Sequence, residues 1–574
     1  YSFVQNADGS WQATGIAGAG LADGSDKLVA IETLQFADKT MTLSATGPVA
    51  ATAPAAGGAT GGAVGTPLST AVIHAPDVPV ATGSQDIVGF VLENTGTSAQ
   101  AAGVVSFGQV FVSGDVMPGA RLVAVIGGVE IPVQMDVKAL NADGSVRHAI
   151  LSLNAPAIAA GGSVEMMLKE AAAAPAGAAL TAQDAIAHGL NVTLDVNLHN
   201  ADGSTTMKSF SAASLLQNAI VQNKVETWMS GTQASEFRVE ATVATGLKAV
   251  FDIRVMADGN IHTDVILAND STFTPGINSF TYDVAIKQGA AVVYSEANMF
   301  HHANSTWHQD AWLKGESAIN VQRDVDYLVR SGAVPALDTA LGVSEAAIQA
   351  DASAIAAADT GPLGTALVTQ SMPMTGGRAD IGATPEWYAR YVLTQDARPY
   401  EVMLANADAA GSVPWHYTDE ATGNAVRVDQ HPGLWIDYRG LGAGSIPDLG
   451  TAADYAGWSP DTAHNPALSY LPYLFTGSHY YLDEMQAQAA WTVATRDPVY
   501  TLAPGVLLPS SEQLRAMAWT IRDLMDAAYL TPDGDPMKAY FDGLVEKNLA
   551  SLVDIYVTQG HNNAAGELEG WLSA

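Results

Sequence analysis

The first strong pattern along the chain is an alternation of apolar and polar residues between about 85 and 298. Runs such as "RLVAVIGGVEIPVQMDVKAL" and "KAVFDIRVMADGNIHTDVILAN" are rich in Val and Ile and have the period of two that is typical of β-strands. Asp-Gly turns separate several runs, as in "NADGS" at 141–145. We therefore expect a β-sandwich or barrel region over 85–315, divided into two units by the Ala-rich stretch 170–187.

The pattern changes to helical spacing from residue 316 onward. The segments "ARYVLTQDARPYEVMLANA", "LPYLFTGSHYYLDEMQAQA" and "AAYLTPDGDPMKAYFDGLV" each place an aromatic residue, Leu and Thr around a turn between two helices. Recurring helical hairpins close into an (α/α) toroid or form an open solenoid. The predicted fold is therefore multidomain, β then α, with a toroid-like helical domain over 316–574.

The chain begins with two further segments. Residues 1–45 read as short strands, with an Asp8-Gly9 turn between two alternating runs. Residues 46–84 consist largely of Ala, Gly, Thr and Pro and predict a flexible linker. Because the chain opens inside a β-like run, "YSFVQNADGSW", we expect it to be a piece of a longer protein.

One motif in the first segment resembles a known family. The stretch "GSDKLVAIETLQFADKTMTL" resembles the end of an RTX (hemolysin-type) repeat segment, G-x-D-x-L-x-x-I-E-x-L-x-F-x-D, although the glycine-rich nonapeptides of such arrays are nearly absent. The resemblance implies a secreted protein with Ca²⁺ bound by Asp23 and Asp26. An ordinary β-hairpin explains the same residues equally well. The matching positions are Gly24, Asp26, Leu28, Ile31, Glu32, Leu34, Phe36 and Asp38.

The charge and the amino-acid composition of the chain exclude some classes of binding partner. The net charge is −34, with 25 basic residues against 59 acidic ones, which argues against nucleic acid because phosphate binding needs clustered Lys and Arg. The chain has no cysteine, and its acidity suits a salty or calcium-containing medium, so we expect an extracellular protein. No run of about 20 apolar residues occurs, so no membrane span is expected. We expect no organic cofactor.

The loops between the predicted helices are rich in aromatic and polar residues. Trp and Tyr faces stack on sugar rings, while Arg, His and Asn hydrogen-bond hydroxyls and carboxylates, so this mixture indicates a glycan site. Arg515, Trp519 and Arg522 share one helical face. A transition-metal site is less favoured, because the chain lacks H-E-x-x-H and cysteine. The candidates for sugar contact are His302, Trp307, His308, Trp387, Trp415, His431, Tyr473 and Trp519.

The stretch "MFHHANSTWHQDAWLKG" at 299–315 joins the β region to the helices. Its His302, Trp307, His308 and Trp312 either line a cleft between the two regions or pack in a seam between them. We prefer a sugar-binding edge to a metal site for this stretch.

A β region followed by an (α/α) toroid with His, Tyr, Arg and Asn in its loops resembles polysaccharide lyases of the alginate, heparinoid and exo-rhamnogalacturonan types. The resemblance implies β-elimination on a uronate-containing polysaccharide, in which a base removes the C5 proton while the neighbouring carboxylate is neutralised. The best base and acid pairs are His416 with Tyr417 and His464 with Tyr470. The best neutralisers are Arg378, Arg515 and Asn465.

Two other readings stay open. A glycoside hydrolase would need two carboxylates, for which Asp380 with Asp419 or Asp461 are candidates. A non-catalytic glycan-binding protein, such as an adhesin or a phage-tail component, would use the same residues to grip a glycan, in a homo-oligomer or a larger assembly.

Overall fold

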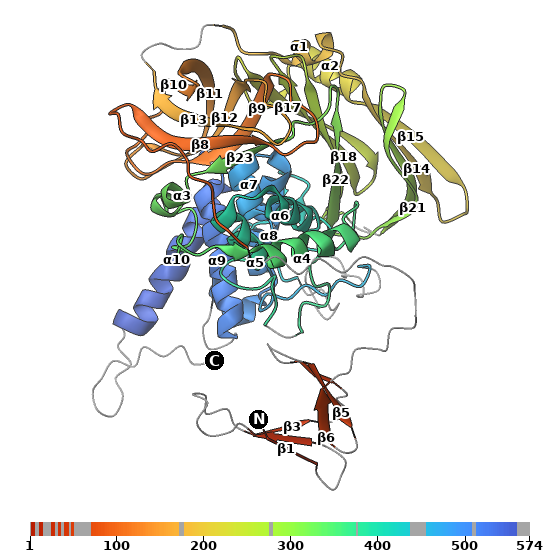
Figure 1. The fold of residues 1–574 in the computed structure, drawn as a ribbon. Helices are drawn as coiled ribbons and strands as arrows, with labels where there is room; N and C mark the ends of the chain where they lie inside the picture. The colour runs from red at the N-terminus through yellow and green to blue at the C-terminus, as the bar shows by residue number, and fades with distance from the viewer. Residues whose placement is uncertain are drawn as a thin grey trace, which may run out of the picture. The chain divides into compact units, whose positions relative to one another are not determined.

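The computed structural model describes residues 71–171, 177–274, 279–374, 377–436, 455–507 and 513–558, and of the first 70 residues only the backbone of six short strands. The chain forms two compact units, Tyr1–Leu68 and Ser69–Ala574 (Figure 1). In the first unit the strands form two antiparallel sheets, β1-β2-β3 and β4-β5-β6. Their bounds are Ser2–Gln5, Trp11–Thr14, Ser25–Leu28, Thr33–Gln35, Thr40–Ser44 and Gly47–Ala50.

The proposed calcium ligands belong to this first unit. Asp23 lies outside the described residues, and Asp26 lies in β3, where only the backbone is described. Calcium binding at Asp23 and Asp26 therefore stays a prediction.

The second unit starts with a seven-stranded antiparallel sheet that curls into a nearly closed barrel. The strand order is β23-β8-β13-β10-β11-β12-β9, and side chains such as Phe90, Phe107 and Leu151 fill the interior. The strands are β8 (Asp86–Asn94), β9 (Gly103–Val110), β10 (Leu122–Ile126), β11 (Val129–Leu140), β12 (Val146–Ala155), β13 (Ser163–Glu170) and β23 (Ile319–Arg323).

The two edge strands of this barrel, β9 and β23, are joined by a side chain. Arg323 on β23 donates from Nη2 to the carbonyl of Gly108 on β9 over 3.0 Å, and to the carbonyl of Phe475 over 3.1 Å. We call this gap between β9 and β23 the barrel seam. Since β23 follows residue 315, the β region extends somewhat further along the chain than the sequence pattern indicated.

A β-sandwich follows the barrel along the chain. A four-stranded sheet, β15-β14-β20-β21, packs on a five-stranded sheet, β16-β17-β18-β19-β22, around residues such as Leu194, Phe251 and Leu267. Helices α1 (Ala182–Ala187) and α2 (Ala212–Gln222) pack against the same core. The strands are β14 (Val192–His199), β15 (Thr205–Ser211), β16 (Glu226–Met229), β17 (Ala234–Ala244), β18 (Leu247–Met256), β19 (Ile261–Asn269), β20 (Phe280–Gln288), β21 (Ala291–His301) and β22 (Ser305–Trp312).

The helical region contains the three hairpins that the sequence indicated, α5 with α6, α7 with α8, and α9 with α10. Gln395 and Gly477, with φ of 52° and 66°, end α5 and α7 in the left-handed conformation and turn the chain into the next helix. The helices are α3 (Val325–Ser331), α4 (Glu345–Ala357), α5 (Glu386–Thr394), α6 (Ala397–Asp408), α7 (Tyr470–Thr476), α8 (His479–Ala494), α9 (Leu514–Leu530) and α10 (Lys538–Val553), with a 3₁₀ turn at Pro498–Tyr500 and a π turn at Asp554–Thr558.

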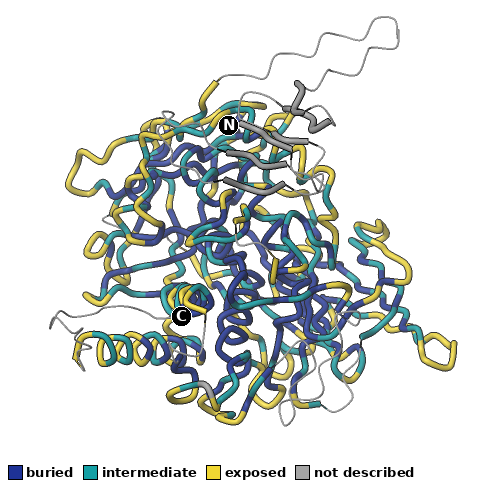
Figure 2. Tube along the Cα trace, turned by 90° about the horizontal axis from the view of Figure 1, so that it is seen from below, coloured by how far each residue is buried: buried dark blue, intermediate teal, exposed yellow. Residues whose placement is uncertain are grey.

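Helix α8 lies among the other helices of this region (Figure 1) and is buried on nearly every side. Figure 2 shows that buried helical turns fill the interior, while exposed residues lie at the periphery. Closure of the helices into a toroid stays a prediction. Among the described residues, none of the helices combines the length and the apolar character needed to cross a membrane. Short two-stranded pairs connect the loops: β7 (Val72–Ile73) with β24 (Val343–Ser344), β25 (Thr418–Asp419) with β26 (Asn424–Ala425), and β27 (Thr501–Ala503) with β28 (Val506–Leu507).

Candidate functional site

Four residues that the sequence put forward for catalysis lie together beside α9, and we call Arg378, His464, Asn465 and Arg515 the Arg–His cluster. Arg378 precedes α5, His464 and Asn465 precede α7, and Arg515 lies in the first turn of α9. Arg378 Nη2 donates to the His464 carbonyl over 3.1 Å, and Arg515 Nη2 lies 2.5 Å from His464 Nε2. Asn465 Nδ2 donates to Asp523 over 2.6 Å. Two loops and a helix thus meet at His464, where Arg378 binds its carbonyl and Arg515 contacts its imidazole.

The hydrogen bonds of His464 indicate which ring nitrogen carries the proton. The Arg515 guanidinium can only donate, so His464 Nε2 accepts and keeps its lone pair on that side. Nδ1 then carries the proton and donates it to the carboxylate of Asp461. An imidazole that is oriented by a carboxylate and has a lone pair on its other nitrogen is suited to act as a general base.

Arg515 supplies a positive charge at this lone pair. No ion pair joins Arg515 to a carboxylate within the residues that the structure describes, and its Nε is buried there without a hydrogen-bond partner. Arg378 differs, because its Nε donates to Asp380 over 2.9 Å. One turn along α9, the half-buried Trp519 ring lies 5.0 Å from the Arg522 guanidinium carbon. A guanidinium and an imidazole nitrogen are therefore in contact at the start of α9, with an aromatic side chain one turn further along the helix.

The other candidates lie elsewhere in the helical region. Tyr470 donates its hydroxyl proton to the Ala333 carbonyl over 2.7 Å and takes no part in the Arg–His cluster. His431 is half-buried, and its Nε2 lies 3.0 Å from Asp419. Trp387, Trp415, Tyr417 and Tyr473 are buried in the core of the helical region.

The buried histidines of the 299–315 stretch have structural roles. His302 Nε2 donates to the Ser412 carbonyl over 2.7 Å, and Trp307 Nε1 donates to the Tyr282 hydroxyl over 2.7 Å. Both side chains are almost fully buried, and burial lowers the pKa of His302 to about 4. Of the four residues proposed to line a cleft in this stretch, His308 and Trp312 do reach one.

That cleft lies on one face of the five-stranded sheet. In β18, Phe251 and Ile253 point into the sandwich core, while Asp252 and Arg254 point to the other face. Register places Arg238, Asp252, Asp264 and Asp310 in one row across β17, β18, β19 and β22 on this second face. We call this the ionic face of the sheet.

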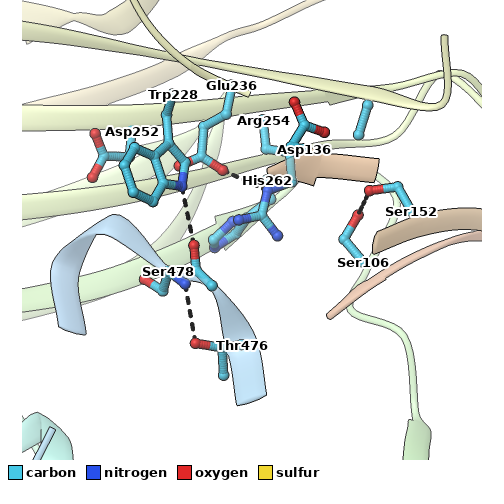
Figure 3. A network of polar contacts seen from close by, with 12 residues as sticks. Ser106, Asp136, Ser152, Trp228, Glu236, Asp252, Arg254, His262, Thr476 and Ser478 are labelled. Carbon is cyan, nitrogen blue, oxygen red and sulfur yellow. Dashed lines mark hydrogen bonds and ion pairs between the residues drawn. The ribbon is translucent and has the colours of Figure 1, made fainter. Parts of the chain in front are cut away.

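Salt bridges on the ionic face connect the sheet to α8. Arg238 binds Asp252 through two bonds of 2.7 Å and reaches Asp483 of α8 over another 2.7 Å. Although burial alone would lower the pKa of Arg238, these two carboxylates raise it well above its usual value. Arg254 Nε lies 2.5 Å from Glu236 and faces the turn between α7 and α8, where Trp228 Nε1 donates to the Gly477 carbonyl over 3.0 Å (Figure 3).

A cavity of about 260 Å³ lies where the barrel seam, the ionic face and the helices meet, and we call it the seam cavity. Two histidines, two arginines and three tyrosines are among the groups that line it. Arg323 enters it from the seam and donates to the Tyr391 hydroxyl over 3.3 Å. The polar and aromatic lining includes Arg254, His262, His308, Asp310, Trp312, Asn320, Arg323, Tyr391, Tyr400 and Tyr481.

Two histidines on the ionic face contact three aspartates. His308 Nδ1 lies 2.9 Å from Asp264, and its Nε2 lies 3.0 Å from Asp408 at the end of α6. His262 Nε2 lies 2.5 Å from Asp310. One ligand atom from each of Asp264, His308 and Asp310 lies within 4.8 Å of the others, so these three residues could hold a metal ion.

A second cavity, of about 420 Å³, lies at the other end of the ionic face and contains His416. The Nδ1 of this buried imidazole lies 3.1 Å from the Asn304 carbonyl and 3.0 Å from the Val413 carbonyl, which can only accept, so Nδ1 bears a proton. Nε2 lies 2.7 Å from Glu484, and although burial alone would lower the pKa of His416, Glu484 raises it.

The lining of this second cavity is predominantly acidic, so we call it the acidic cavity. Its cationic side chains are Arg238 and Lys248, with His416 and His479 beside them. An anionic sugar is therefore a poor ligand for it. Its carboxylates are Glu226, Glu240, Asp270, Asp483, Glu484 and Asp535.

Sequence reasoning missed the ionic face, although it left a signal. Strands such as "KAVFDIRVM" alternate Asp and Arg with large apolar residues, which indicates a strand with one apolar face and one charged face. The partners on α6 and α8, Asp408 and Asp483, carry no such signal. No protein-family model matches the chain, and no curated protein matches its sequence.

Proposed function

We propose that the chain is a carbohydrate-active lyase that cleaves a uronate-containing polysaccharide by β-elimination at the Arg–His cluster. The observation that carries the proposal is the contact between Arg515, which has no carboxylate partner within the described residues, and the lone pair of His464. The β region followed by helical hairpins supports the proposal, since it suits the toroid-bearing lyases that the sequence resembles. Secretion and the closed toroid belong to the same proposal.

Each residue of the cluster has a place in the reaction. Arg515 binds the uronate carboxylate and stabilises the negative charge that develops on it as C5 loses its proton. When Arg515 turns from His464 Nε2 to the uronate carboxylate, Nε2 is free to take that proton, and Asp461 stabilises the imidazolium. The C4–O bond breaks as the C4=C5 double bond forms, and the imidazolium returns its proton to the leaving oxygen. Trp519 offers a flat face to a neighbouring sugar ring.

The partners of the nearby carboxylates favour elimination over hydrolysis at this place. Asp380 is paired with Arg378, Asp461 is bound to His464, and Asp523 is bound to Arg522 and Asn465, so these three carboxylates already hold a partner. A glycoside hydrolase needs one carboxyl group to donate a proton to the leaving group and a second to act as base or nucleophile.

The test is to incubate the purified full chain with a panel of uronate polysaccharides and to follow the ultraviolet absorbance of an unsaturated product. We expect His464→Gln and Arg515→Gln to lower kcat/KM by at least about 100-fold, because each removes a group that acts in the transition state. The control is His199→Gln, which breaks a His–Asp contact in the sandwich and touches none of the candidate residues.

Three outcomes would contradict the proposal. New reducing ends without ultraviolet absorbance would indicate a hydrolase. Glycan retained on the protein without any product would indicate a binding protein. An elimination activity that His464→Gln leaves unchanged would move the reaction to another site.

A further inference from the structure

The metal-ligating residues of the ionic face come from two adjacent strands. Asp264 on β19 is directly opposite Asp310 on β22, and His308 precedes Asp310 by two residues on the same face. His308 Nδ1 is 2.9 Å from Asp264, and the three ligand atoms lie within 4.8 Å of one another. Ligand atoms around an ion with bonds of about 2.0–2.2 Å lie about 3–4 Å apart. His308 and Asp264 already have nearly this spacing, and a small movement of side chains would bring all three ligand atoms to it.

Groups outside the triad hold these ligands in place. Asp408 lies 3.0 Å from His308 Nε2, and the Tyr481 hydroxyl donates to Asp408 over 2.7 Å. A metal-binding histidine in proteins usually has its other nitrogen held by such a carboxylate. On the far side, His262 contacts Asp310 and stacks on Trp312 with 4.3 Å between ring centroids.

The charged side chains around Asp264 and Asp310 are compatible with a bound cation. The nearest guanidinium groups are engaged, because Arg238 binds Asp252 and Asp483, and Arg254 binds Glu236. Asp264 and Asp310 stand opposite each other on neighbouring strands, where like charges repel. Their contacts to cationic groups are with the imidazoles of His262 and His308, and a metal ion would take the place of the proton on His308 Nδ1.

We propose that Asp264, His308 and Asp310 bind one first-row divalent metal ion, with the remaining coordination positions facing the seam cavity. A donor set of one imidazole nitrogen and carboxylate oxygens suits Zn²⁺ or Mn²⁺, whereas Ca²⁺ and Mg²⁺ take oxygen ligands. His308 and Asp310 line the seam cavity, and the Asp310 side chain is 42% exposed, so an ion can enter.

This inference does not rest on the proposed lyase activity. The metal triad and the Arg–His cluster share no residue, and the test of the metal site needs no substrate.

The test uses the full chain, stripped with a chelator and then titrated with Zn²⁺ or Mn²⁺ alone by calorimetry, with the bound metal counted by mass spectrometry. We expect one ion per chain, lost in His308→Gln and in Asp264→Asn. Asp408→Asn, which removes only the group that orients His308, should weaken binding by about 10–100-fold. The control His199→Gln breaks a similar His–Asp contact of 3.1 Å in the same sandwich and should bind as the parent does.

Several results would overturn the proposal. The proposal is wrong if the full chain binds no ion, if His308→Gln binds the ion as tightly as the parent does, or if the chain binds only Ca²⁺. If circular dichroism shows that the variants at His308 and Asp264 misfold, the variants at Asp310 and Asp408 decide, since these side chains are 42% and 37% exposed. X-ray absorption of the Zn²⁺ form should then show nitrogen and oxygen ligands at about 2.0–2.2 Å.

Discussion

Single histidines in this protein have opposite electrostatic roles that depend on their partners. His148, His301 and His302 are fully buried and face backbone carbonyls or a hydroxyl, and burial lowers their pKa values to about 4, 3 and 4. Neighbouring carboxylates instead raise the pKa values of His308 and His416 despite burial. Sequence alone could not separate the two groups, because the partners of His416 and His302 are 68 and 110 residues away.

The buried neutral histidines make stability depend on pH. Between about pH 6.5 and 4 the unfolded chain binds protons at these positions and the folded chain does not, so the free energy of unfolding should fall as the pH falls through this range. Each histidine should contribute on the order of 2–3 kcal/mol over the whole range. Urea unfolding at a series of pH values checks this.

His148 offers the sharpest version of this test. Its Nε2 donates to the Leu474 carbonyl over 3.1 Å, so His148→Gln loses some stability at pH 7. As the pH falls, the free energy of unfolding of the variant should also decrease less steeply than that of the parent. The reason is that unfolding of the variant takes up about one proton fewer. A variant with the same slope as the parent would contradict the assignment.

At the scale of elements, one amphipathic sheet organises the second unit. Its apolar face completes the sandwich, and its ionic face binds α8 and borders both cavities. Alternating patterns predicted the strands, and the three helical hairpins were predicted from their recurring turns. Which strand lies beside which could not be predicted, because alternation sets the face of each side chain and leaves the register between distant strands open.

Arg238 is the strongest link between the sheet and α8. Arg238→Met should destabilise the chain by about 3–5 kcal/mol, because it leaves the buried Asp252 without a counter-charge. Asp483→Asn should cost only about 1 kcal/mol, because this carboxylate is 43% exposed. Urea unfolding of both variants checks the order. Equal losses would show that Asp252 finds another partner.

At the scale of the whole molecule, the three large apolar cores among the described residues lie in the second unit, and the stretch that resembles an RTX repeat falls in the first. The sequence predicted the change from strands to helices. It did not predict that β23, which follows the sandwich, completes the barrel, since five residues give no information about a partner more than 200 residues away.

A chain that starts at Ser69 should fold as the full chain does. Because the cores that the structure describes lie within Ser69–Ala574, we expect removal of residues 1–68 to shift the melting temperature by less than about 2 °C and to leave zinc binding unchanged. Any stabilisation by Ca²⁺ should disappear with residues 1–68, as differential scanning calorimetry would show. A large loss of stability would mean that the first unit supports the second.

The late position of β23 has a consequence for synthesis. β13 ends at Glu170 and β23 begins at Ile319, so the ribosome releases the whole sandwich before the final strand of the barrel emerges. Until then β8 has one unpaired edge, and such edges bind other chains. Arg323, the last residue of β23, arrives with the strand that covers this edge. Nascent chains stalled before Ile319 are therefore the species in which a chaperone would find the barrel open.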